Sequence, residues 1–363
     1  MPVVYVEPPR AAMAVRQRRA RLLPTTADNC HVVQSPTGIP GDRVLSLVNR
    51  AVQRRLGAAI TDALAQLHLE CAVLWIDRIE SAPLIDMFRG SLVVYDCVDE
   101  EWTFGRLRWR SYLQRLEESV AARADLVIAS SNALRNRLSE IVSRAELVPN
   151  GCDYQHFSQS ACGGARPAGL PAAGVPLIGF IGGVTRRALD YALLQNAFAQ
   201  LPSYHFVFVG SYDAASKRVI AGAPNATLLG SRPYDELPAY LSSFDVAIIP
   251  YLVGRNIDYV YPKKLHEYLA AGKPVVATDL PEIRAFQHVV RIARSPAEFV
   301  RAIEECVREA CDPVRAAEHI ARRRAVAWNN TWEKRVRQIA DLLDIGICEY
   351  RSSSHLCSAR DHA

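Results

Sequence analysis

Two lysines and a glutamate lie close together in the segment from Val253 to Pro281, at a spacing that suits phosphate binding. Pro262 can open a helix at its first position, because the N–H that proline lacks would have no partner there. Lysine side chains and the unpaired backbone N–H groups of a helix start both favour phosphate. The pattern predicts a helix end facing a ligand, although such a helix is also common on protein surfaces. Its first turns hold Lys263, Lys264, His266 and Glu267.

The elements before this helix decide between the two interpretations. Strands predicted at Leu177 to Ile181, His205 to Val209 and 226–229 run into Gly182-Gly183, Gly210 and Gly230. They alternate with helices near 190–201, 214–221 and 235–243, and the strands Val246 to Ile249 and Pro274 to Ala277 follow. Ligands of doubly wound sheets bind outside the carboxyl ends of the strands. We therefore expect the glycines to line a crevice, where backbone N–H groups can approach a pyrophosphate.

The first half of the chain shows the same alternation. Strands are predicted at Val3 to Val6, Ala72 to Ile76, Leu92 to Tyr95, Leu126 to Ala129 and Glu146 to Val148, with helices around 44–67, 81–88, 105–123 and 131–140. This order predicts a parallel sheet with helices on its faces. Turn residues at 149–151 place the boundary there: a domain over 1–150, a linker over 151–176, a second domain over 177–312, one helix over 313–345 crossing back to the first domain, and a flexible tail over 346–363.

Composition limits the classes of protein that this chain can represent. Half of its 363 residues are hydrophobic, which excludes global disorder. No apolar run is long enough to span a membrane and no signal pattern opens the sequence, so a cytoplasmic protein is expected. Nine cysteines without a CxxC pair predict no metal site. Neither GxGxxG after a strand nor GxxxxGK[ST] occurs, which disfavours dinucleotide dehydrogenases and P-loop enzymes.

The formal charge of +5 is modest, but arginines cluster locally. Arg106, Arg108 and Arg110 have the aromatic neighbours Trp102, Phe104 and Trp109. Such a cluster could lie on an anionic membrane surface at the inner face of the cell membrane, or could be a solvated helix face. No recognition motif accompanies the charge, so nucleic acid is not an expected partner.

Several motifs together resemble the group 1, family 4-like retaining glycosyltransferases that build bacterial surface polysaccharides. They are Val94 to Glu100, Ala124-Asp125 before Ser130-Ser131, Val148 to Asp153 with Phe157, Gly179 to Gly183, Pro224-Asn225 with Gly230, Phe244 to Val246, and Pro262-x-Lys264-x-x-Glu267-Tyr268-Leu269-Ala270-x-Gly272-x-Pro274. They follow the family's order over nearly the whole chain. The resemblance implies an α/β protein with the GT-B fold, two Rossmann-like doubly wound domains facing a central cleft. Its donor would be a nucleoside-diphosphate sugar and its acceptor a glycan or a lipid-linked glycan.

The same resemblance assigns roles to individual residues. Glu267 would accept hydrogen bonds from the donor ribose, and Lys264 would neutralise the pyrophosphate without a metal or cofactor. Asp99 would contact the sugar, so Asp99, Lys264 and Glu267 are the candidate catalytic residues. The remaining donor-binding candidates follow the strand ends or flank the helix: Gly182, Gly183, Arg186, Arg187, Gly210, Ser231, Arg232, Pro233, Tyr259, Pro262 and Lys263.

The chain departs from the family in three places. Tyr259 stands where many relatives have the first of two glutamates, with Asp258 as a possible substitute. Arg186-Arg187 is not followed by the usual lysine. Similar proteins also have a strand, a glycine loop and a helix before the segment that corresponds to Val3 to Pro9, whereas Met1 stands just before it here. Either the sequence begins at an internal codon or the protein lacks part of its crevice.

Three functions agree with these observations. The first is a glycosyltransferase acting with retention in polysaccharide or cell-envelope biosynthesis. The second is a nucleotide-sugar epimerase or phosphorylase on the same scaffold, although only Asp99, Glu100 and Glu101 offer acid or base groups, all on one side of the sugar. The third is a non-catalytic subunit, which Tyr259 and the absent first unit would permit.

Overall fold

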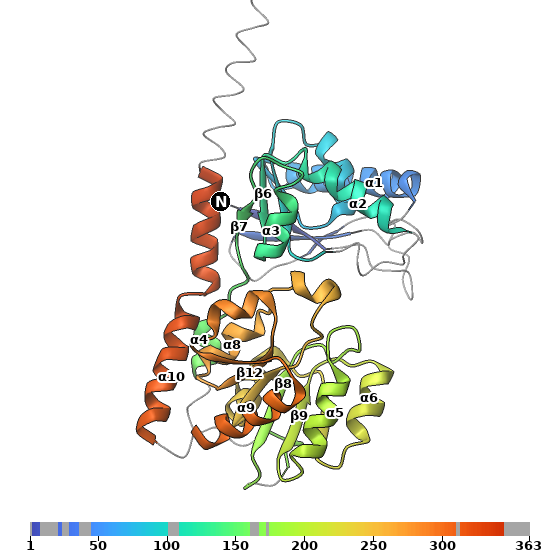
Figure 1. The fold of residues 1–363 in the computed structure, drawn as a ribbon. Coiled ribbons are helices and arrows are strands. Elements are labelled where there is room, and N and C mark those ends of the chain that lie inside the picture. The colour runs from blue at the N-terminus through green and yellow to red at the C-terminus, as the bar shows by residue number, and fades with distance from the viewer. Residues whose placement is uncertain are drawn as a thin grey trace, which may run out of the picture. The chain divides into compact units, whose positions relative to one another are not determined.

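The computed structural model describes residues 2–7, 21–23, 29–35, 45–100, 109–159, 167–171, 174–309 and 313–344 (Figure 1). The chain divides into two compact units. One comprises Met1–Ser130, Leu134–Leu147 and Asp341–Ala363, and the other comprises Ser131–Ala133 and Val148–Ala340. Arg106 and Arg108 of the predicted membrane-facing cluster, the start of the predicted helix at 105–123, parts of the predicted linker and the predicted tail lie outside the described residues.

The first unit contains a four-stranded parallel sheet in the order β4-β5-β6-β7. Its strands are β4 (Val73–Ile76), β5 (Leu92–Cys97), β6 (Leu126–Ala129) and β7 (Glu146–Leu147). The accompanying helices are α1 (Ser46–Gln66), the 3-10 helix η1 (Ile79–Asp86), α2 (Arg110–Ala121) and α3 (Asn132–Leu138). The first four residues of β5 are all buried, which explains the unbroken apolar sequence of a strand covered on both faces.

A separate three-stranded sheet of the first unit differs from the expectation of one all-parallel sheet. β1 (Val3–Val6) pairs in parallel with β3 (Cys30–Gln34), and β2 (Arg21–Leu23) pairs with β3 in the antiparallel direction. The sequence did not predict β2 or β3. Both are short, and His31 and Gln34 leave only two adjacent apolar residues, Val32 and Val33, in the middle of β3, too few to mark a buried strand.

The second unit contains six parallel strands in the order β10-β9-β8-β11-β12-β13. They are β8 (Leu177–Ile181), β9 (His205–Val209), β10 (Ala226–Gly230), β11 (Val246–Ile249), β12 (Val275–Thr278) and β13 (Val290–Ala293). The described helices are α4 (Tyr154–Ser158), α5 (Tyr191–Gln200), α6 (Ala214–Ala221), α7 (Leu237–Ser242), α8 (Lys264–Ala270), α9 (Pro296–Glu309) and α10 (Pro313–Trp328), with 3-10 helices η5 (Tyr234–Glu236), η6 (Arg255–Tyr259) and η7 (Pro281–Phe286).

Helices cover both faces of this sheet. α5 contacts α9, whereas α8 contacts α4 and α10, and α4 also contacts α7 (Figure 1). All residues of β8, β11 and β12 are buried. Parallel strands covered on two faces need such continuous apolar sequences, which is why the sequence predicted β8, β9 and β11 at their observed bounds.

The single helix predicted over 313–345 is wrong. α10 ends at Trp328, Asn329 and Asn330 form a turn, and a new helix runs over 332–344. The break has a tertiary cause, because Thr331 forms a parallel bridge with Cys152. The Cys152 N–H donates to the Asn330 carbonyl at 3.0 Å, and the Trp332 N–H donates to the Cys152 carbonyl at 3.2 Å.

The described residues contain neither a membrane-spanning helix nor a cluster of metal-ligating side chains. No helix among them combines the length and apolar character that crossing a bilayer requires. No group of three or more potential metal-ligating side chains occurs in the same ranges.

Candidate functional site

The glycines that end β8, β9 and β10 lie against one another. The Gly182 N–H donates to the Val209 carbonyl at 2.8 Å, and the Gly210 N–H donates to the Gly230 carbonyl at 2.9 Å. A Cβ on Gly210 would lie 2.0 Å from the Gly182 carbonyl oxygen, and Gly210 has a φ of 142°. Both restrictions require glycine at Gly210. The three glycines thus lie together at the carboxyl ends of their strands, and the ligand crevice expected there stays a prediction.

Gly183 differs from its neighbours because nothing in the fold requires a glycine there. A Cβ on Gly183 would meet no atom within 4 Å, and its φ is not positive. The residue is exposed at the end of β8. The space in front of its backbone is therefore open to a ligand.

Lys264 lies beside this turn and is buried, with 9% of its surface exposed. Its ammonium group donates to the Tyr251 hydroxyl and lies 4.7 Å from the Tyr251 ring centre and 5.4 Å from that of Phe180. A Cβ on Gly182 would lie 3.0 Å from Lys264 Cε. Aromatic faces attract a cation without neutralising its charge. Among its described contacts Lys264 has no carboxylate partner, so its charge is available to an anion at the turn.

Glu267 follows Lys264 by three residues on α8 and is half-buried. None of the described residues donates a hydrogen bond to its carboxylate. Burial raises the pKa of Glu267, while the charges of Lys263, Lys264 and His156 oppose that rise. A half-buried carboxylate without a protein donor is unusual, because burial of a charge costs free energy unless it is paired. Its acceptor oxygens are thus available to hydroxyl groups of a ligand.

The start of α8 differs by two residues from the prediction. The helix begins at Lys264 with Lys263 as its N-cap residue, so Pro262 lies before the cap rather than at the first helical position. The Leu265 N–H donates to the Pro262 carbonyl at 3.0 Å, which makes the entry a tight turn. His266 is fully buried, and its Nε2 lies 2.7 Å from the Tyr261 hydroxyl. His266 therefore makes its contacts inside the protein, whereas the Lys263 side chain is exposed to solvent.

The loop that follows Gly183 is held by hydrogen bonds to neighbouring segments. Asp213 accepts from the Arg186 N–H at 3.0 Å and from the Ser216 N–H at 2.8 Å. These bonds, with that of the Ser216 hydroxyl as the largest cause, lower the pKa of Asp213 to about 2. Leu189 forms an antiparallel bridge with Tyr251, the residue that accepts from Lys264. The loop presents Arg186 and Arg187 as exposed side chains.

The residues after Gly230 are partly engaged within the protein. Ser231 and Pro233 are exposed. Arg232 donates from Nε to the Tyr240 hydroxyl at 2.9 Å, and its guanidinium lies 5.8 Å from the Tyr240 ring centre. The Arg232 side chain is therefore oriented by the protein, and the role predicted for Ser231, Arg232 and Pro233 at the base stays a prediction.

Two residues near Glu267 were not predicted as site residues. His156 stacks on Tyr234, with ring centres 4.4 Å apart and an angle of 7° between the planes. Burial and then the charge of Glu267 raise the pKa of Tyr234 to about 12, so its hydroxyl keeps its proton. His156 lies on α4 and Tyr234 on η5, and no spacing in the sequence connects these distant segments.

Tyr259 ends the 3-10 helix η6, where relatives with the two-glutamate pattern would have an acidic side chain. Asp258, the substitute considered from the sequence, accepts a hydrogen bond from the Gly254 N–H at 3.0 Å. One of its oxygens is thus used to close the η6 turn. The role of Tyr259 in donor binding stays a prediction.

Asp99 follows the end of β5 in the first unit, as predicted, and burial raises its pKa. Its neighbour Glu100 is buried and lies 3.5 Å from Arg137, which also pairs with Glu117 at 2.7 Å. Burial is the largest cause that raises the pKa of Glu100 to about 7, while the charge of Arg137 lowers it. This ion cluster supports the loop that carries Asp99 from within the first unit.

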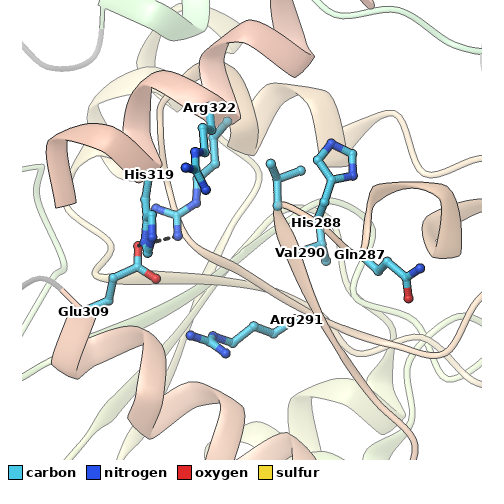
Figure 2. A pocket seen from close by; sticks show the side chains of 9 residues that line it. Gln287, His288, Val290, Arg291, Glu309, His319 and Arg322 are labelled. Atoms are coloured by element: carbon cyan, nitrogen blue, oxygen red, sulfur yellow. Dashed lines mark hydrogen bonds and ion pairs between the residues drawn. The ribbon is translucent and has the colours of Figure 1, made fainter. Parts of the chain in front are cut away.

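A cavity of about 170 Å³ lies elsewhere on the second unit, where β13 begins (Figure 2). Three arginines and a histidine of its lining are paired with carboxylates. Arg291 lies 2.9 Å from Glu305, Arg322 lies 2.6 Å from Glu318, and Arg323 and His319 both contact Glu309. The amino ends of the parallel strands are at the opposite edge from the glycine turns. We therefore place the candidate site at Lys264 and Glu267.

Comparison with known proteins identifies the family of this chain. The family model described as glycosyl transferases group 1 matches residues 175–309, which include all six strands of the second unit. The putative teichuronic acid biosynthesis glycosyltransferase TuaH of Bacillus subtilis (strain 168) is 30% identical over 295 residues, 76% of this chain and 72% of that protein. The chain belongs to the group 1 glycosyltransferases.

Solved structures show the fold of this glycosyltransferase. Sucrose-phosphate synthase from Thermosynechococcus elongatus superposes with a TM-score of 0.74 at 16% identity, covering 96% of this chain and 89% of that chain. Anabaena HepE, solved in complex with UDP and glucose, gives a TM-score of 0.60 at 15% identity, covering 87% of this chain and 86% of that chain. At such identities the likeness concerns the fold alone. The predicted GT-B fold and the prediction of a glycosyltransferase are confirmed.

Proposed function

We propose that this glycosyltransferase moves a sugar from a nucleoside-diphosphate sugar to a glycan or lipid-linked acceptor, with retention of configuration. One observation carries the proposal. A buried lysine and a half-buried glutamate flank the glycine-lined strand ends of one unit, and within the described part of the chain the lysine has no carboxylate partner and the glutamate no hydrogen-bond donor. A nucleoside diphosphate matches both groups, because it has a pyrophosphate for the cation and ribose hydroxyls for the carboxylate.

The reaction breaks the bond between the sugar carbon and a phosphate oxygen, and negative charge develops on the leaving diphosphate. The Lys264 ammonium, fixed by the Tyr251 hydroxyl, would stabilise this charge without reorganising. Arg186 and Arg187 would add mobile cations at the outer side of the turn. This arrangement supports leaving-group stabilisation by the protein itself, with no metal assigned to the site.

Glu267 would orient the donor through its ribose. Its carboxylate must be ionised to accept two hydroxyl hydrogen bonds, and the charges of Lys263, Lys264 and His156 favour that form. Asp99 would contact the sugar from the first unit. Lys264 and Glu267 would hold the donor on the second unit, so catalysis would come mainly from position and electrostatics.

Relatives support the choice of donor and acceptor. HepE has been solved with UDP and glucose, and a trehalose-6-phosphate protein of E. coli has been solved bound with UDP-2-fluoro glucose. A study of trehalose-6-phosphate synthase concerns glycosyltransfer with retention. TuaH is described as acting in teichuronic acid biosynthesis, which supports a cell-envelope polysaccharide as the product of the present enzyme. Its site of action would be the cytoplasmic face of the cell membrane.

Binding of UDP, GDP, ADP and dTDP by isothermal titration calorimetry tests the proposal. At least one should bind the wild type, and Lys264→Ala and Glu267→Ala should each weaken it by about 10- to 150-fold, the equivalent of roughly 1.5–3 kcal/mol for a lost charged hydrogen bond. Lys217→Ala and Glu318→Ala, which change exposed side chains elsewhere, should not. Unchanged affinity in both site variants would remove the proposed donor site.

The configuration of the product tests retention separately. Once a donor and acceptor pair is found, NMR of the new glycosidic linkage should show the anomeric configuration of the donor sugar. An inverted linkage would refute retention while leaving the donor site in place.

A further inference from the structure

The hydrogen-bond ladder between β8 and β11 stops before β8 ends. Its paired residues are Ile178 with Val246 and Gly179 with Ala247, whereas β8 remains paired with β9 as far as Ile181. Beyond Gly179, the backbone of Ile181 on the β11 side needs another partner, because buried N–H and C=O groups are costly when unpaired. That partner is a side chain from a helix.

Tyr268 supplies both missing hydrogen bonds. Its hydroxyl accepts from the Ile181 N–H at 2.8 Å and donates to the Ile181 carbonyl at 3.2 Å. The side chain is fully buried, at 0% exposure. Burial also raises the pKa of Tyr268 well above its usual value, so the hydroxyl keeps the proton that it donates. The Tyr268 hydroxyl thus takes the place of the inter-strand hydrogen bonds that Ile181 would otherwise make with β11.

The position of Tyr268 connects the two sides of the candidate site. Ile181 immediately precedes the Gly182 turn, and Tyr268 lies on α8 immediately after Glu267 and one turn after Lys264. The space between the turn and the helix is tight, since a Cβ on Gly182 would lie 3.0 Å from Lys264 Cε. Any change in the separation of β8 and α8 would therefore move the Lys264 ammonium relative to the turn.

We propose that Tyr268 is a positioning residue whose hydroxyl sets the distance between the glycine turn and Lys264, and thereby aligns the site for a diphosphate. The inference rests on the proposed function, which supplies the diphosphate. The ring alone does not do this, because phenylalanine would fill the same volume but leave both backbone groups of Ile181 without partners. A misplacement of about 1 Å is enough to weaken aligned contacts at such sites.

The variant Tyr268→Phe tests the proposal, because it keeps the packing of the ring. We expect a Kd about 10-fold higher than that of the wild type for UDP, or for whichever of GDP, ADP and dTDP the wild type binds in its place. The Kd is measured by calorimetry at 10 °C on protein shown to be folded by circular dichroism. In a Lys264→Ala background the same substitution should change the Kd by less than about 2-fold. If Tyr268 acts through Lys264, the effects of the two substitutions on the Kd should not add in this way.

Asn225→Ala is a matched control for lost stability. Asn225 is buried just before β10, and its side-chain amide donates to the carbonyls of Phe198, Leu201 and Tyr204 at 3.0–3.2 Å. The variant also removes side-chain hydrogen bonds to backbone groups, but at the opposite edge of the sheet from the glycine turns. Its melting temperature should fall while its Kd for UDP stays within 2-fold of the wild type.

The outcomes separate this inference from the proposed function. If Tyr268→Phe lowers the melting temperature as Asn225→Ala does but binds UDP with the wild-type Kd, the hydroxyl is only structural and the inference is refuted. An equal loss of affinity with and without Lys264 would also refute it. If the wild type binds none of UDP, GDP, ADP and dTDP, the proposed function fails first and the inference fails with it.

Discussion

Gly183→Ala separates what the fold requires at the turn from what a ligand requires. Gly183 has no positive φ and a Cβ would meet nothing within 4 Å, so the folded protein can accept alanine. Gly210 provides the contrast, because a Cβ there would lie 2.0 Å from the Gly182 carbonyl oxygen. The two glycines lie at neighbouring strand ends but have different reasons to be glycine.

The expected magnitudes follow from these environments. Alanine in place of Gly183 should leave the free energy of unfolding unchanged or raise it by about 0.4–1 kcal/mol, because the unfolded chain loses conformational freedom. If a diphosphate approaches the backbone of the turn, the new methyl group would displace it from at least one charge-assisted hydrogen bond. The loss of about 1.5–3 kcal/mol corresponds to a Kd higher by about 10- to 150-fold.

Thermal unfolding and UDP calorimetry on the same preparations provide the test. Gly183→Ala should melt at or slightly above the wild-type temperature and bind UDP weakly. Gly210→Ala should melt at a lower temperature, because the backbone of the turn must move to relieve the overlap. Wild-type affinity in a stable Gly183→Ala protein would show that the diphosphate does not use this turn, and would refute our reading of the open space.

Two further predictions concern a charge and a contact of the second unit. Because burial raises the pKa of Glu267, its carboxylate protonates at higher pH than that of an exposed glutamate. UDP affinity measured by calorimetry should decrease as the pH falls through that raised pKa. Glu267→Gln should bind weakly and keep only the pH dependence that comes from the phosphate of UDP. The same raised pKa means that the ionised group costs stability above it, so Glu267→Gln should melt higher than the wild type at pH 7, and a lower melting point would contradict this. Gly179→Ala should cost about 1–3 kcal/mol in chemical denaturation, because its Cβ would lie 2.0 Å from the Phe244 ring, and Phe244→Leu should recover part of that loss. Additive losses in the double variant would show that the two residues do not compete for the same space.

Local patterns were sufficient for much of the second unit. β8 is continuously apolar and ends at glycine, so its bounds could be predicted from residues adjacent in sequence. Lys264 and Glu267 share a helix, and their spacing alone placed them together. Contacts between distant segments could not be predicted in this way. The bridge between Cys152 and Thr331 interrupts the last helix, and the Tyr268 hydroxyl reaches Ile181 across 87 positions.

The first unit shows the same limit more strongly. β3 contains the polar residues His31 and Gln34 and forms a sheet with β1 and the antiparallel β2, so its pairing depends on its partner strands rather than on its own composition. The ion cluster of Glu100, Glu117 and Arg137 is likewise assembled from a loop and two helices. Charged residues that pair only through the tertiary fold resemble surface residues in a single sequence.

The residues around Lys264 all belong to one compact unit. They are the glycine turns, Tyr251, Glu267 and Tyr268. The family model matches a stretch within that same unit. A gene segment that encodes this unit can therefore be exchanged between related enzymes without separating the residues around Lys264. Recombination at the unit boundary would pass on the turn, the strand end and the helix together in one step, whereas point mutation would have to rebuild each of them separately.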